Sequence, residues 1–260
     1  MRSKCATYPM PEKAEKNPRM ALHEPVAISL GFVGVYLVPA GDGYVLVDAG
    51  MQGSVAKIFA DMAKHGLVPE AIRLIFITHA HGDHVGSLQA IARRTHAPVL
   101  ASRLEAPAIE GGHCLHPHGL TPFGKAFALV MNMARWADTP SDSPCPVDVM
   151  VDDERSLADF GVAGRAVHTP GHTAGSLSLL LDSGEAFVGD LCAKVPVVGG
   201  SYVPFFGDGD RGTVYASWQR LLDAGATRIY PDHGAPFPAA ALRQELARSR
   251  RPLARSMTIT

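Results

Sequence analysis

The chain contains 260 residues, 47% of them hydrophobic, and its 24 basic and 25 acidic side chains leave a formal net charge of −1. This content can bury a large core, and without a long run of Lys or Arg we expect no nucleic-acid partner. The four cysteines are too few and too irregularly spaced for a disulfide framework, which favours a reducing, cytoplasmic setting.

The N-terminal stretch, residues 1–22, is interrupted by prolines and charged side chains. It lacks the apolar segment of a signal peptide, so we expect a flexible arm. No window of the chain approaches the roughly 18 uninterrupted apolar residues of a membrane span, so no membrane association is expected. Residues 23–260 are interpreted as one domain.

The first half of this domain has strand patterns that lead into helix patterns. Two β-rich runs joined by a Gly-Asp-Gly turn predict a hairpin, and apolar positions three and four residues apart predict amphipathic helices. A run without polar alternation predicts a strand that is buried on both faces. In chain order, the predictions are strands 33–38 and 44–47, a helix from Val55, strand 74–77, and a helix from Val85 that ends before Pro98.

Between residues 102 and 148 the pattern changes to helical segments, 104–110 and 123–136, separated by loops rich in His, Pro, Ser and Asp. We interpret 102–148 as an insertion, either a substrate cap or a dimer surface, and a homodimer is therefore left open.

Strand patterns return after the insertion at 166–168, 176–181 and 185–188, with a tight turn between the last two. A helix capped by Thr213 follows, with Trp218 on its buried side. Because both halves show strands followed by helices, the sequence predicts an α/β fold in which two sheets form a sandwich with helices outside. The last predicted elements are strand 228–230 and helix 239–247.

A histidine-rich segment lies directly between a predicted buried strand and a predicted helix. His79 and His81 alternate along an extended chain, and Asp83 and His84 fall in the turn that follows, so the four side chains can converge on a metal ion. Clustered His and Asp at this spacing are typical of a metal site, and ordinary loop histidines are the weaker interpretation.

Three later turns end in further metal-binding residue types, namely His172, Asp190 and His233, and each follows a β-rich run. The pattern HxHxDH, then H, D and H, resembles that of the metallo-β-lactamase superfamily. The resemblance covers residues from about Gly31 to Pro236, and the segment 46–50 matches the early motif of that superfamily.

The resemblance implies a four-layer αββα sandwich with two divalent metal ions at one edge of the sheets. The implied bridging ligand is Asp190, and Asp48 would support the site without binding metal. Zinc suits such a ligand set, although manganese, iron or cobalt can occupy similar sites. The implied ligands are His79, His81 and His172 for the first ion and Asp83, His84 and His233 for the second.

The implied chemistry is metal-assisted hydrolysis, in which the ions acidify a water molecule to hydroxide and polarise the scissile group. Asp83 and His233 are the residues expected to take part in catalysis, Asp83 by orienting the attacking hydroxide. We expect a small-molecule substrate.

The long interval between His84 and His172 is similar to that of lactonases and the related organophosphate hydrolases, so an ester or lactone is the leading substrate class. Residues 169–176 resemble glyoxalase II, a thioesterase. Only 27 residues (234–260) follow His233, which is too few for the glutathione-binding domain of that enzyme. A persulfide dioxygenase with a single iron is the remaining alternative.

Three more histidines, His113, His116 and His118, lie within the insertion. They allow a third metal site, but Gly and Pro residues nearby and the lack of a carboxylate favour a solvated lid loop. The apolar segment 201–207, with Met131, Met133 and Trp136, is interpreted equally as a substrate wall or as core beneath the insertion.

Overall fold

The computed structural model describes part of the chain, and the arm 1–22 and His116 lie outside that part. None of the helices that it describes has the length and apolar character needed to span a membrane. The described residues are 24–115, 118–120, 122–133, 144–193, 202–204 and 206–250.

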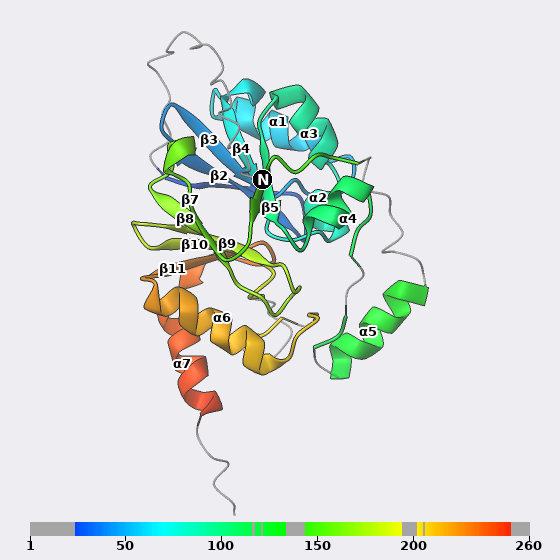
Figure 1. The fold of residues 1–260 in the computed structure, drawn as a ribbon, viewed down its shortest axis with the longest axis vertical. Helices are drawn as coiled ribbons and strands as arrows, with labels where there is room; N and C mark the ends of the chain where they lie inside the picture. The colour runs from blue at the N-terminus through cyan, green and yellow to red at the C-terminus, as the bar shows by residue number, and fades with distance from the viewer. Residues whose placement is uncertain are drawn as a thin grey trace, which may run out of the picture.

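The fold is a sandwich of two sheets, each with six strands in the described residues, and helices cover the outer face of each sheet (Figure 1). The predicted αββα architecture is therefore confirmed. Buried apolar residues form three groups, one between the sheets and one beneath the helices on each side. Phe76 and Phe187 fill the space between the sheets, whereas Trp218 packs between the second sheet and its helices.

The first sheet begins with an antiparallel hairpin and continues with parallel strands. Its fourth strand has the apolar sequence expected for a strand buried on both faces. The first, fifth and sixth strands were not predicted, because they have only three or four residues each. In spatial order the strands are β1 (Val26–Ser29), β2 (Gly34–Ala40), β3 (Gly43–Val47), β4 (Ile72–Phe76), β5 (Val99–Ser102) and β6 (Val149–Val151).

The second sheet also has six described strands. In spatial order they are β12 (Phe237–Pro238), β11 (Arg228–Pro231), β10 (Glu185–Gly189), β9 (Leu177–Leu181), β8 (Gly164–His168) and β7 (Glu154–Ser156). This sheet is antiparallel except for one parallel pair, β10 with β11. The predicted turn at 182–184 joins β9 to β10, and the short edge strands β7 and β12 were not predicted.

The described α-helices are α1 (Val55–Lys64), α2 (Gly82–Val85), α3 (Leu88–Thr95), α4 (Ala106–Gly111), α5 (Pro122–Met133), α6 (Arg211–Asp223) and α7 (Ala240–Ser249). Helices α1 and α3 lie on the first sheet, and α6 and α7 lie on the second (Figure 1). Two short 3-10 helices, η1 (Pro69–Ala71) and η3 (Ala158–Phe160), complete the described helical elements.

Two helix predictions need correction. The helix expected from Val85 is divided into α2, which ends at Val85, and α3, which begins at Leu88, because the backbone of Ser87 is not helical (φ −109°, ψ 9°). Gly86, between the two, packs so closely that a Cβ there would lie 2.3 Å from the backbone nitrogen of Gln52. Thr213 does not cap α6. Asp210 is the N-cap, and its carboxylate accepts the Thr213 N–H at 2.8 Å, since an anionic acceptor is favoured where helix N–H groups are unpaired.

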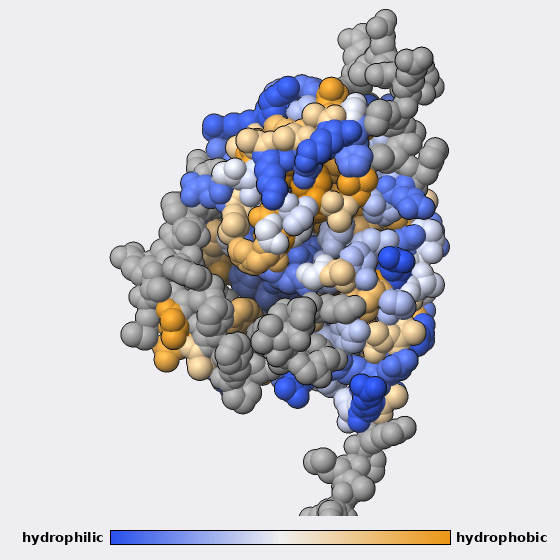
Figure 2. Space-filling model, turned by 180° about the vertical axis from the view of Figure 1, so that it is seen from behind, coloured by the Kyte–Doolittle hydropathy of each residue, from blue (hydrophilic) through white to orange (hydrophobic). Residues whose placement is uncertain are grey.

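In the described part of the connection between β5 and β6, residues 103–148, helices α4 and α5 have different surroundings. Ala106 and Ile109 of α4 are buried in the core beneath the first sheet. Helix α5 lies away from the sheets (Figure 1), and its Leu129 and Val130 side chains are each 61% exposed. Figure 2, turned by 180°, shows an apolar surface at the lower left, on the side where α5 lies.

Candidate metal centre

The seven predicted ligands come from four turns that meet at one edge of the sandwich. The segment 79–84 follows β4 and enters α2, His172 lies between β8 and β9, Asp190 follows β10, and His233 follows β11. These turns are close because β10 and β11 are parallel neighbours, and because Leu177 N donates to Thr78 O across the two sheets at 2.8 Å.

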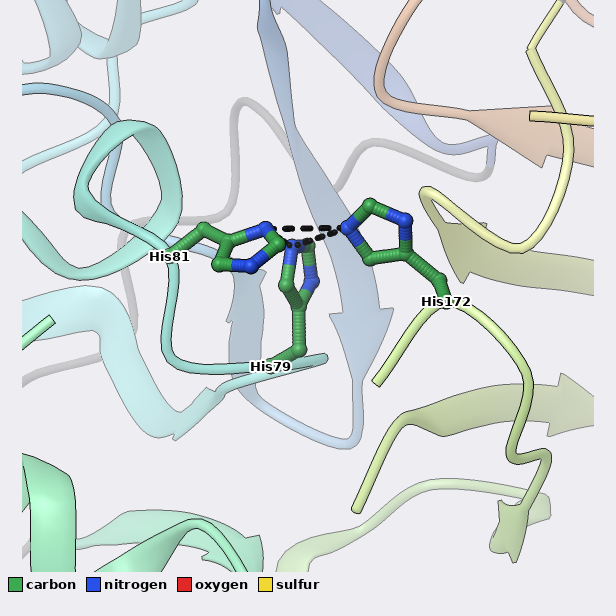
Figure 3. Close-up of side chains that lie close together, drawn as sticks. All are labelled: His79, His81 and His172. Atoms are coloured by element: carbon green, nitrogen blue, oxygen red, sulfur yellow. Dashed lines mark hydrogen bonds between the residues drawn. The ribbon is translucent and has the colours of Figure 1, made fainter. Parts of the chain in front are cut away.

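Three buried imidazoles, those of His79, His81 and His172, form the first cluster (Figure 3). His79 Nε2 lies 3.0 Å from His81 Nδ1 and 3.1 Å from His172 Nε2, and the last two atoms are 2.9 Å apart. Tetrahedral zinc with Zn–N bonds of about 2.0–2.1 Å separates its nitrogen ligands by about 3.3 Å. The nitrogen triangle therefore fits one small divalent cation.

Asp83, His84 and His233 form the second cluster. His84 Nε2 lies 3.7 Å from Asp83 Oδ1, and His233 Nε2 lies 3.3 Å from Asp83 Oδ2. This set combines two imidazoles with a carboxylate, whereas the first cluster has imidazoles alone.

Asp190 lies between the clusters. Its Oδ2 atom is 3.5 Å from His172 Nε2 in the first cluster and 3.4 Å from His233 Nε2 in the second. Its Oδ1 atom is 3.5 Å from His84 Nε2, and neither of these two buried atoms makes a hydrogen bond. Buried polar atoms without a partner are costly, and a cation between them would satisfy both.

Hydrogen bonds behind the imidazoles select the nitrogen that faces the site. Nδ1 of His172 donates to Phe206 O at 3.1 Å, and Nδ1 of His233 donates to Phe32 O at 2.8 Å. Because Nδ1 of both rings donates to a carbonyl oxygen, Nε2 is the atom that faces the site and is available to bind a cation. The Phe32 ring also stacks on His233, with centroids 5.4 Å apart.

Asp48 orients two further imidazoles, that of His84 directly and that of His79 through Thr78. Its Oδ2 atom accepts from His84 Nδ1 at 2.8 Å and from Thr78 Oγ1 at 2.6 Å, and its Oδ1 atom accepts from Thr78 N at 2.8 Å. Thr78 Oγ1 in turn lies 3.0 Å from His79 Nδ1. Asp48 has a left-handed backbone with φ of 61°, a conformation that Asp tolerates better than most residues.

The two clusters have opposite electrostatic character. Burial lowers the pKa of His79 and His172 and lowers that of His81 to about 3. Burial alone would also lower the pKa of His84 and His233, but nearby carboxylates, above all those of Asp83 and Asp190, raise it well above 6.5. In the metal-free protein, protons on His84 and His233 balance the negative charges of Asp83 and Asp190. Bound cations would balance the same charges.

Asp190 and Asp83 stay ionised in these surroundings. Burial would raise the pKa of either carboxyl, but the charges of His233 and His84 lower that of Asp190 well below 3.8. The charge of His84 and a hydrogen bond from His233 lower the pKa of Asp83. Both groups are therefore available as anionic ligands at neutral pH.

Sequence reasoning missed two buried acids beside the centre. Asp232 Oδ2 lies 3.2 Å from His84 Nδ1, and burial followed by the charge of Asp48 raises the pKa of Asp232 well above its ordinary value. Glu105 accepts hydrogen bonds from two ligand loops. Asp232 could have been found, because it directly precedes the predicted ligand His233 in the sequence. The sequence around Glu105 contains no comparable signal.

The histidines of the 103–148 connection do not join these clusters in the described part of the chain. His118 Nδ1 pairs with Asp208 Oδ1 at 2.6 Å, and no group of metal-binding side chains found there includes His113 or His118. Phe206, from the predicted apolar segment, contributes its carbonyl to His172. Met131, Met133 and Trp136 have side chains outside the described residues.

Comparisons with known proteins agree with this geometry. The chain is 26% identical over 232 residues to the uncharacterised protein YobT of Bacillus subtilis (strain 168), covering 84% of this chain and 91% of YobT. It is 26% identical over 238 residues to the atrochrysone carboxyl ACP thioesterase AgnL7 of Paecilomyces divaricatus, covering 88% of this chain but only 60% of AgnL7.

Among solved structures, the crystal structure of TTHA1623 in a di-iron-bound form matches with a TM-score of 0.60 and 26% identity, covering 85% of this chain and 96% of that one. Residues 28–233 match the family described as the metallo-beta-lactamase superfamily. The matched region contains both clusters and Asp190. The chain therefore belongs to the metallo-β-lactamase superfamily and is an enzyme of that superfamily.

Proposed function

We propose that the protein is a dinuclear metal-dependent hydrolase that cleaves an ester or lactone bond in a small-molecule substrate. The observation that carries this proposal is the position of Asp190, whose Oδ2 atom lies 3.5 Å from His172 in the first cluster and 3.4 Å from His233 in the second. A shared carboxylate lets two cations approach within about 3.5–4 Å, because its charge offsets their repulsion.

Two divalent cations bound here would acidify a water molecule and polarise the scissile carbonyl group. The protein side chains would position the attacking water molecule and accept protons. Asp83 stays ionised, and its side chain is 24% exposed, so it can accept a hydrogen bond from an attacking water molecule and orient it. His233, whose side chain is 19% exposed, lies beside Asp83 at the same opening.

We further propose zinc as the native metal, since five imidazoles suit it. Iron is the principal competitor, because TTHA1623 has been solved in a di-iron-bound form and ligand type alone does not fix the metal. Metal analysis of protein expressed without added metal decides between the two.

A thioester is the second candidate substrate class. It is favoured by the similarity to AgnL7, which is described as an acyl-carrier-protein thioesterase. An organophosphate hydrolase and a mononuclear-iron persulfide dioxygenase remain further alternatives, and the metal count separates the latter from a dinuclear hydrolase.

Two expectations about the cellular context also remain proposals. We propose a cytoplasmic location, which is supported by the free cysteines Cys145 and Cys192 in the described part of the chain. We also propose a homodimer that forms through the exposed apolar side of α5. Sedimentation of the purified protein tests this proposal.

The proposed function is tested by proton release from acyl lactones, simple esters and acyl thioesters, each with and without a chelator. We expect chelator-sensitive turnover of lactones or esters. Turnover of thioesters alone would replace the lead with the second candidate. If protein with two bound metals per chain releases no acid from any of the three, the carbonyl substrate is wrong, and phosphoesters become the next class.

A further inference from the structure

The buried side chain of Glu105 connects the two loops that carry the first cluster. Glu105 is 2% exposed and precedes α4, but its side chain does not cap that helix. Instead, Oε2 accepts the Ala80 N–H at 2.9 Å. Oε1 accepts the Thr173 hydroxyl at 2.7 Å and the Gly175 N–H at 3.0 Å. The two carboxylate oxygens therefore accept hydrogen bonds from two loops that belong to opposite halves of the sandwich.

These partners are immediate neighbours of metal ligands. Ala80 lies between His79 and His81, and Thr173 follows His172. Ala80 O also accepts from Leu115 N at 2.9 Å, so the 103–148 connection holds both polar backbone groups of Ala80.

The fit around the carboxylate is close. A Cβ at Gly175 would lie 2.5 Å from Glu105 Oε1, so a side chain there would displace the carboxylate. Removing a buried acceptor with three donors would leave those donors without a partner, which is costly away from water.

We infer that Glu105 is a positioning residue of the first cluster, holding the His79–His81 loop and the His172 loop at the spacing that a cation requires. The inference rests on the proposed metal function, since it gives that spacing a purpose. The second cluster is held differently, by Asp48 behind His84 and by Phe32 O behind His233. Loss of the Glu105 carboxylate should therefore affect the two clusters unequally.

The first test measures zinc binding to the metal-free full-length protein by competition with a chromophoric chelator. We expect Glu105→Gln to weaken one of the two binding events by about 10–100-fold, the range found for groups that orient metal ligands, and to leave the other near its wild-type value. In a His233→Ala background, which disrupts the second cluster, the remaining event should be the weakened one.

Glu110→Gln is the matched control. Glu110 lies toward the other end of α4, accepts from Val147 N at 3.3 Å, and has no hydrogen bond to either ligand loop, so its variant should bind zinc as the wild type does. The inference is overturned if Glu105→Gln binds both ions normally, or if it weakens both equally.

A second readout needs no metal. Amide hydrogen exchange at Ala80 should accelerate in metal-free Glu105→Gln, because the Gln amide can present a donor where Ala80 N–H needs an acceptor. Unchanged exchange at Ala80 would contradict the inference.

If Glu105→Gln does not fold, Thr173→Val and Thr173→Ser decide the question. Valine removes the hydroxyl that donates to Glu105, and serine retains it. We expect Thr173→Val to weaken zinc binding and Thr173→Ser to restore it, whereas equal binding by the two would overturn the inference. A wild type that binds two zinc ions but hydrolyses none of the substrates would reject only the proposed function.

Discussion

The two clusters of the candidate metal centre use similar side chains but differ in burial and charge. The first cluster is three buried imidazoles whose pKa values are lowered by burial. The second cluster reaches the surface through Asp83 and His233, and carboxylates raise the pKa values of its two imidazoles. The first cluster is thus a neutral set of nitrogen ligands, whereas the second holds protons that a cation must displace.

This difference bears on how a dinuclear site can divide its work. A buried neutral cluster binds a cation without competition from protons near pH 7, so it suits a permanently occupied position. A cluster that contains carboxylates and opens to solvent suits the position where water and substrate enter. Asp190 contacts both, so the clusters are linked through one side chain.

The largest expected effect comes from removing that link. Asp190→Ala should lower hydrolytic activity by more than about 100-fold and weaken both zinc-binding events, because the variant lacks the anion between the two cations. Steady-state kinetics and zinc titration provide the measurement. Asp223→Ala, on the exposed side of α6, is the control and should resemble the wild type. Weakening of only one event would show that Asp190 is not shared.

A smaller and one-sided effect is expected from Asp48→Asn. Asn tolerates the left-handed backbone at this position, so the variant removes the charge and replaces one acceptor oxygen by a donor without backbone strain. An amide is a weaker partner for His84 Nδ1 than a carboxylate, and we expect second-cluster zinc affinity to fall by about tenfold. Competition titration measures it, and a larger loss at the first cluster would contradict the division between clusters.

The smallest expected effect is a difference between the two clusters in how their zinc binding depends on pH. Because the pKa values of His84 and His233 are raised, protons compete for the second cluster at a higher pH than for the first. Dialysis in steps from about pH 8 to about pH 5 should remove one zinc ion per chain before the other, with the second cluster emptied first. Simultaneous loss of both ions would contradict this order.

The lowered pKa of His81 also affects the stability of the metal-free protein. The pKa of His81 is about 3 in the folded protein and 6.5 for the free side chain, so below pH 6.5 the unfolded chain binds more protons at this residue. The contribution of His81 to stability is therefore complete above pH 6.5 and decreases as the pH falls toward 3.

Sequence patterns predicted those parts of the molecule that depend on local spacing. His79 and His81 alternate along an extended segment after a buried strand, and this pattern alone placed them on one loop at a strand end. The hairpin of β2 and β3 was predicted because a turn separates two apolar runs. The sandwich followed from the order of strands and helices.

The parts that were missed depend on contacts between distant segments. Glu105 is an ordinary acid before a helix until folding places Ala80 and Thr173 beside it, 25 and 68 residues away in sequence. The short strands β5 and β6 have too few residues for a pattern, and Asp210 rather than Thr213 caps α6 because the carboxylate is the stronger acceptor.

A zinc-soaked crystal and an anomalous difference map would show whether Asp190 joins two cations. We expect two peaks about 3.5–4 Å apart. One should lie within the triangle of His79, His81 and His172, the other beside His84 and His233, with the Asp190 carboxylate between them. A single peak at full occupancy, or a second peak that Asp190 does not contact, would show that the site is not dinuclear in this way.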